Sequence, residues 1–153
     1  MRVPDFRKIV NFGSNFYRGL GNKTILRHIQ HILSGNDVRG KKFLPYNKHY
    51  AKKKGVGVND VNLRLTGKML NSIKLGKVTE QGFKYAMKGT KNIKKMNAHI
   101  SGDYGTKSLK PRVTSDKEDP IPHKVQEFVA LEIARKVARK IQETVDGQVV
   151  IRV

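Results

Sequence analysis

The sequence predicts an α+β fold in which a small antiparallel sheet packs against a long C-terminal helix and an N-terminal helix, with an extended arm and a long loop. Three patterns lead to this prediction: a helical apolar period after residue 22, alternating apolar and polar side chains on both sides of residues 80–82, and a longer helical period near the end of the chain. The 153 residues suit one domain. We therefore expect an arm over residues 1–21 and a single domain over residues 22–153.

The N-terminal part is expected to contain two helices. Residues 1–21 mix aromatic residues with glycines, which indicates an arm with one short helix that is docked by its aromatics. The next helix is expected to start at Asn22 or Thr24, because either side chain can cap a helix, and to end at Gly35. Its apolar residues follow the 3.6-residue period: Ile25, Leu26, Ile29, Ile32 and Leu33. A polar turn follows over residues 35–42.

The middle of the chain predicts short helices and a hairpin. Pro45 excludes a long helix from residue 40 but fits the first turn of a short one. Thr66 can cap another short helix, whose apolar residues Met69, Leu70 and Ile73 then share one side. The alternation over residues 73–79 and 83–88 predicts a β-hairpin. A further helix is expected over residues 92–100.

The C-terminal part begins with a loop over residues 104–122, which contains three of the prolines and is long enough to be functional. The strongest helix of the chain is predicted over residues 123–145, with valines and isoleucines spaced by four and with a neighbouring small-residue stripe: Ala130, Ala134 and Ala138. That stripe would permit the close approach of another element. Residues 148–153 are expected to form a final strand because they are rich in β-branched side chains.

The charge distribution indicates a polyanionic partner. The chain has 32 Lys and Arg against 12 Asp and Glu, a formal net charge of +20. Residues 1–60 contain 13 basic and 3 acidic side chains, residues 61–112 contain 12 and 2, and residues 113–153 contain 7 and 7. The excess therefore lies entirely in the first 112 residues. Such an excess repels itself unless nucleic acid, an acidic protein surface or anionic lipid balances it; nucleic acid, or a protein assembled around it, is the favoured partner.

No pattern of catalytic or cofactor-binding residues is apparent, so we expect a protein that is not an enzyme and has no cofactor. The chain contains no cysteine, no apolar run long enough for a membrane span, and no apolar segment near Met1. We expect that the protein is made in a cytoplasm and does not associate with a membrane. Gly19 to Thr24 lacks the glycine spacing of a phosphate-binding loop. A nuclease whose carboxylates converge only in space remains a third hypothesis.

Two candidate metal sites have simpler explanations. His28 and His31 are three residues apart on the predicted helix, but no carboxylate lies within one turn, and both flank its apolar stripe. Asp116, Glu118 and Asp119 match no cation-binding loop, and negative charge is favoured before the start of a helix. We expect no metal at either place.

Two basic clusters are candidates for contact with DNA or an acidic partner. The first is the triplet Lys52, Lys53 and Lys54, which lies within residues 1–60, where basic side chains exceed acidic ones by ten. The second is the quartet Arg135, Lys136, Arg139 and Lys140, which is expected on one face of the last helix, opposite much of its valine and isoleucine stripe. A solvated helix face, favoured near the C-terminal end of the helix dipole, explains the quartet better, so the triplet is the better candidate.

Three segments together resemble the virion morphogenesis and tail-completion family of tailed phages, the group of the phage Mu G protein. The phrase from Gly40 through Lys52 precedes a leucine, threonine and glycine step, and a short helical phrase then closes on an aromatic residue and a glycine. A proline and an arginine follow, as in the family. The residues that carry the resemblance are Leu65, Thr66, Gly67, Met69, Leu70, Ser72, Tyr104, Gly105, Pro111 and Arg112. After Arg112 the chain departs from the family pattern, which continues with proline and phenylalanine.

The resemblance covers roughly residues 40–112. It implies a structural virion protein at the head–tail interface, a neck or tail-completion subunit that forms a sixfold ring between the capsid connector and the tail. Its implied partners are copies of itself, connector or adaptor proteins, tail-tube or terminator proteins, and packaged DNA in the channel. The alternative, based on the charge alone, is a basic nucleic-acid-binding protein of an architectural or ribosome-associated kind.

Overall fold

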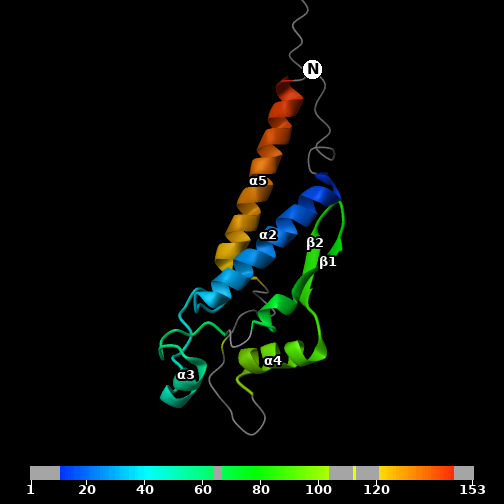
Figure 1. The fold of residues 1–153 in the computed structure, drawn as a ribbon. Coiled ribbons are helices and arrows are strands. Elements are labelled where there is room, and N and C mark those ends of the chain that lie inside the picture. The colour runs from blue at the N-terminus through cyan, green and yellow to red at the C-terminus, as the bar shows by residue number, and fades with distance from the viewer. Residues whose placement is uncertain (1–10, 64–66, 104–111, 113–120, 147–153) are drawn as a thin grey trace, which may run out of the picture.

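The computed structural model describes residues 11–63, 67–103, 112 and 121–146 (Figure 1). Within these residues the predicted α+β class is confirmed. Helices precede and follow a two-stranded antiparallel sheet along the chain. The elements in chain order are α2 (Gly13–Leu33), α3 (Lys48–Lys54), the 3-10 helix η1 (Leu70–Ser72), β1 (Ile73–Val78), β2 (Phe83–Met87), α4 (Thr90–Ser101) and α5 (His123–Asp146).

The predicted start of the first long helix is wrong. Neither Asn22 nor Thr24 caps a helix, because α2 begins nine residues earlier at Gly13 and runs without interruption through the second half of the expected arm. The Thr24 hydroxyl donates a 2.8 Å hydrogen bond to the Leu20 carbonyl oxygen one turn back, which is the pairing of a residue inside a helix. The predicted end is correct, since Gly35 follows the last turn with a φ of +78°.

The predicted hairpin is confirmed. In the pairing of β1 with β2, Ile73 lies opposite Met87 and Leu75 lies opposite Tyr85. An irregularity between Leu75 and Val78 then shifts the register by one residue, so that Val78 lies opposite Phe83. The turn is closed by a 2.8 Å hydrogen bond from the Thr79 amide to the Gly82 carbonyl oxygen.

Helix α2 lies between the hairpin and α5 (Figure 1). Gly21 makes the hairpin contact possible: a Cβ atom at this position would lie 2.5 Å from Leu75 Cδ1 and 3.0 Å from Phe83 Cδ2. On the other side, the Arg27 guanidinium lies 4.0 Å above the centre of the Phe128 ring, and Lys23 pairs with Glu132 at 3.4 Å. The prediction of a small sheet, a long C-terminal helix and an N-terminal helix is therefore confirmed, with α2 as the element that the sheet and α5 both contact.

The main cluster of buried residues lies at the end of α2 that holds Ile32. It is formed by side chains from α2, the segment around α3, η1 and α4: Ile32, Phe43, Tyr46, Ala51, Val61, Leu63, Met69, Leu70 and Met96. Most of these residues come from segments without regular structure, so the side chains of this cluster hold the irregular backbone in place. The predicted polar turn over residues 35–42 follows this end of α2. The Asn36–Lys42 bridge closes the turn, and Val38 within it is buried.

The remaining predicted elements are confirmed where the structure describes them. Helix α4 extends the expected residues 92–100 by two residues at its start and one at its end, and α5 covers the expected residues 123–145. The short helix after Thr66 appears as η1, although Thr66 itself lies outside the described residues. The predicted strand over residues 148–153 and most of the loop over residues 104–122 also lie outside the described residues.

Candidate basic contact surface

The lysine triplet lies in the last turn of α3, a helix with clear start and stop signals. The Asn47 side chain caps its start by accepting a hydrogen bond from the Tyr50 amide at 2.7 Å, and Gly55 ends it in a left-handed conformation. Lys52 and Lys53 are exposed, whereas Lys54 is half-buried. Cations at this end of a helix are favoured by the backbone dipole. Two of the three lysines are therefore available for contact with a partner.

Lys54 belongs to a small polar network centred on Tyr46. The Lys54 ammonium donates to the Tyr46 hydroxyl and to the Asn62 amide oxygen, both at 2.6 Å, and lies 4.5 Å from the centre of the Tyr46 ring. The Tyr46 hydroxyl also accepts a bond from the Leu63 amide at 3.3 Å. This buried tyrosine therefore connects α3 to the chain that leads into the motif segment.

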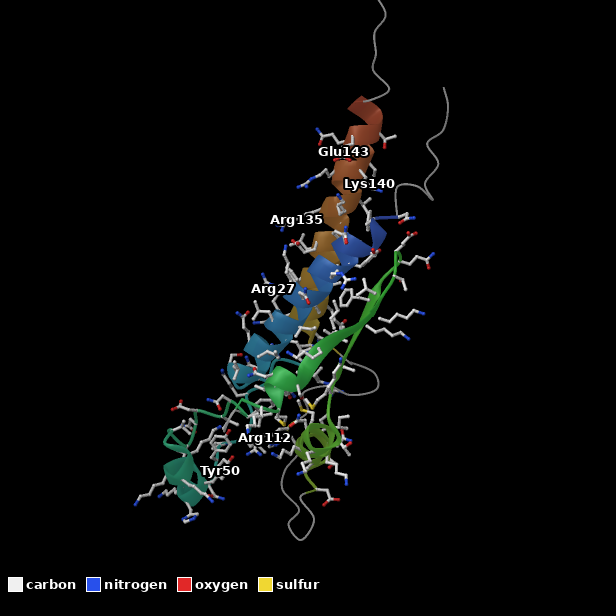
Figure 2. The ribbon with its side chains drawn as sticks, turned by 45° about the vertical axis from the view of Figure 1, so that its right-hand side comes forward. Arg27, Tyr50, Arg112, Arg135, Lys140 and Glu143 are labelled. Atoms are coloured by element: carbon white, nitrogen blue, oxygen red, sulfur yellow. The ribbon has the colours of Figure 1, made fainter. Side chains whose placement is uncertain are left out.

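Arg112 reaches the same tyrosine from a distant part of the sequence. Its guanidinium carbon lies 5.3 Å from the centre of the Tyr46 ring, and its amide donates a 2.7 Å hydrogen bond to the His99 carbonyl oxygen at the end of α4. Figure 2 shows Arg112 and Tyr50 at the same end of the molecule, with Tyr50 on α3 and Arg112 between α3 and α4. The structure thus brings one residue of the family motif together with one residue of the lysine triplet.

Two neighbouring groups respond to this concentration of positive charge. Burial and, to a smaller extent, the charges of Arg112 and Lys54 together lower the pKa of His99 to about 4. Burial and the nearby Tyr46 raise the pKa of Tyr50, while Arg112 opposes this change. Both effects indicate that Arg112 lies close enough to act electrostatically on α3 and on α4.

The basic quartet does not share one solvated face, so this part of the sequence prediction is wrong. Arg135 and Arg139 are exposed, but Lys136 and Lys140 are partly buried. Lys140 donates a 2.5 Å hydrogen bond to the Asn11 carbonyl oxygen and lies 5.6 Å from the centre of the Phe12 ring. The apolar stripe rotates slowly around α5 because a spacing of four exceeds the helical period, and its member Ile141 is exposed while Lys140 packs toward α2.

The described residues of the family motif have structural roles. Gly67 adopts a φ of +75°, Met69 and Leu70 are buried in the main cluster, and the Ser72 hydroxyl donates a 2.6 Å hydrogen bond to the Met69 carbonyl oxygen. The remaining motif residues Leu65, Thr66, Tyr104, Gly105 and Pro111 lie outside the described residues. The described motif residues other than Arg112 thus shape the turn that leads into β1.

The two histidines of α2 have partners within the protein. His28 is buried and its Nδ1 atom lies 2.8 Å from the Tyr85 hydroxyl, while His31 Nε2 lies 2.6 Å from the Asp37 carbonyl oxygen. Burial raises the pKa of Tyr85 to about 12. No group of metal-binding side chains occurs in the part of the chain that the structure describes, which does not include Asp116, Glu118 and Asp119.

Sequence reasoning missed Tyr46 and His99 as members of this surface. Neither residue carries a recognisable motif, and the contacts join positions that are up to 66 residues apart, from Tyr46 to Arg112. The available signal was the grouping of Tyr46 and Tyr50 around Lys48 in an otherwise basic segment, since aromatic residues among cations are typical of nucleic-acid-binding surfaces.

No family model, no curated protein and no solved structure matches this chain. Among the helices of the described residues, none is long and apolar enough to cross a membrane.

Proposed function

We propose that the protein is a structural subunit of the head–tail interface of a tailed-phage virion, a neck or tail-completion protein that assembles into a ring. The proposal is supported by the resemblance of residues 40–112 to that family and, above all, by one observation on α5. A strip along the exposed side of α5, bordered by Arg135 and Arg139, is apolar over three turns and is formed by Ala130, Leu131, Ala134, Ala138 and Ile141.

This α5 face suits contact between copies of the chain. Its five residues fall within about 100° of the helix circumference, and the two large side chains, Leu131 and Ile141, are 49% and 42% exposed. Residues 113–153 also carry equal numbers of basic and acidic side chains, so this region is the one where two copies would repel each other least. An apolar, electrically balanced surface on an otherwise strongly basic molecule favours self-assembly over a monomeric state.

The test is the native mass of the purified protein. We expect a closed ring, six copies by family resemblance, in light scattering and native mass spectrometry. Leu131→Glu places a charge in the contact and is expected to yield monomers, whereas Asn97→Glu adds the same charge at an exposed position of α4 and should leave the ring intact.

A wild-type protein that stays monomeric at high concentration would contradict the ring. If such a monomer also bound nucleic acid tightly and were absent from virions, the alternative of a free nucleic-acid-binding protein would replace the proposal. Particles lacking the protein should accumulate as separate heads and tails, and density for the protein is expected at the joint between them.

A further inference from the structure

Lys54 and Arg112 form a pair of cations around one aromatic ring, and no carboxylate of the described residues balances them. Their charged groups lie 4.5 Å and 5.3 Å from the centre of the Tyr46 ring. The side-chain partners of Lys54 are a hydroxyl and an amide, both neutral. Neither cation forms an ion pair with a carboxylate of the described residues; the ion pairs that join two described residues are those of Glu132 in α5.

Arg112 has a further unsatisfied group. Its Nε atom is buried and has no hydrogen-bond acceptor within the described structure. A buried donor on a charged group costs more when it is unpaired than when it is paired, and an anion brought close to the guanidinium reduces that cost. The same anion would also reduce the repulsion between Arg112 and Lys54. The surface therefore has two reasons to attract a negative group.

The surroundings favour a long polyanion over a single carboxylate. Residues 38–59 contain seven Lys and Arg and no Asp or Glu. Of the α3 side chains near the two cations, Lys48, Lys52 and Lys53 are all exposed. Such a concentration of cations suits the repeated charges of a nucleic-acid backbone, whose binding releases condensed counterions.

Tyr50 adds an aromatic surface beside the cations. Its ring is 37% exposed and packs edge-on against Tyr46 with ring centres 4.9 Å apart. Exposed aromatic rings beside a row of cations are the usual means by which proteins hold unpaired bases. Within this surface, Tyr50 is thus positioned to contact a base while Lys54 and Arg112 contact the phosphate.

We infer that Lys54 and Arg112, with His99 close to them, form a binding site for a backbone phosphate of single-stranded nucleic acid, with one base stacked on Tyr50. This inference does not depend on ring formation, because every residue of the site belongs to one copy of the chain. It assigns to Arg112 a ligand-binding role in addition to its contact with Tyr46.

The binding test uses the full chain and a labelled single-stranded oligothymidylate. Lys54→Gln and Arg112→Gln each remove one charge and are expected to weaken binding roughly tenfold, because one charge-assisted phosphate contact is lost. The slope of log affinity against log salt should also become shallower by about 0.7 in each variant. Lys84→Gln removes the same charge from an exposed position of β2 and should change the affinity less than about twofold.

A second measurement needs no substitution at the two cations. The His99 ring signals are followed by NMR with and without the oligonucleotide, and His99→Gln identifies them among the five histidines. A phosphate at the site should raise the pKa of His99, because a nearby negative charge favours the imidazolium form. An oligonucleotide that binds without changing this pKa would overturn the site.

Other outcomes also contradict the inference. Equal weakening by Lys84→Gln would mean that only diffuse charge matters, and unchanged affinity in folded Lys54→Gln and Arg112→Gln proteins would remove the two cations from the site. If polyglutamate or inorganic phosphate bound as tightly as the oligonucleotide and with the same dependence on Arg112, the ligand would not be a nucleic-acid backbone.

Tyr50→Ala should weaken single-strand binding more than duplex binding. The native mass of each variant, measured in parallel, separates a failed site from a failed ring.

Discussion

Tyr46 illustrates how much of this structure depends on single side chains that connect irregular segments. Its hydroxyl accepts hydrogen bonds from Lys54 and from the Leu63 amide, and its ring lies beside the charges of Lys54 and Arg112. Leu63 has a φ of +48°, a conformation that is uncommon for a residue with a branched side chain. The bond from its amide to Tyr46 is one of the interactions that hold it there.

His99 makes the stability of the protein dependent on pH. Its pKa is about 4 in the folded protein against 6.5 for a free histidine. Between these values the unfolded chain binds a proton at His99 that the native protein does not bind. The contribution of neutral His99 to stability is therefore fully present above pH 6.5 and is lost as the pH decreases to 4. We expect a loss of about 2 kcal/mol, allowing for partial screening by solvent. Urea unfolding at pH 7 and pH 4.5 measures it, and His99→Gln should show a correspondingly smaller loss.

The contact between His28 and Tyr85 joins α2 to the hairpin through a partly buried hydrogen bond. Tyr85→Phe removes the hydroxyl that lies 2.8 Å from His28 Nδ1 and is expected to destabilise the protein by about 1 kcal/mol. Tyr50→Phe removes a hydroxyl from a more exposed ring and serves as the control. Equal midpoints of urea unfolding for the two variants would contradict a stabilising role for this bond.

Among the elements, α2 contains two glycines with opposite expected effects. Gly21 faces the hairpin, so Gly21→Ala forces the new methyl group against Leu75 and Phe83 and should cost about 1–3 kcal/mol. At Gly19 an added Cβ atom has no neighbour within 4 Å, so Gly19→Ala should stabilise the helix by about 0.5–1 kcal/mol. Thermal unfolding of the two variants compares the same change on two faces of one helix. A stabilised Gly21→Ala protein would contradict the close packing.

The elements also show why some predictions succeeded and others failed. The apolar periods of α5 and of the hairpin strands are local, and both elements were predicted correctly from them. The start of α2 was predicted wrongly, because the glycines within residues 1–21 indicate an arm, whereas the close approach of Leu75 and Phe83 requires a glycine inside the helix. That requirement comes from a strand more than fifty residues away. The assembly of Tyr46, Lys54, His99 and Arg112 could not be predicted for the same reason, since no local pattern specifies those contacts.

For the molecule as a whole, the net charge of +20 acts against the folded state. Like charges are closer together in the compact protein than in the unfolded chain, and salt screens their repulsion over about 10 Å at 0.1 M. We expect the midpoint of thermal unfolding to rise by a few degrees, about 2–4 °C for each kcal/mol gained, between 0.05 and 0.5 M NaCl. Equimolar sucrose is the control, and an equal or larger increase in sucrose would contradict an electrostatic cause.

The position of Asn11 has a practical consequence for handling the protein. Its side chain bonds to Glu80 at the hairpin turn and its carbonyl oxygen to Lys140, so the first described residue lies near the far part of α5. In Figure 1 the end of α5 points away from α3 and α4. A surface linker at an exposed residue near this end of α5, such as Glu143, is therefore attached on the side opposite Lys54 and Arg112 (Figure 2). A molecule immobilised in this way presents its basic end outward, ready for measurements of nucleic-acid binding on a sensor surface.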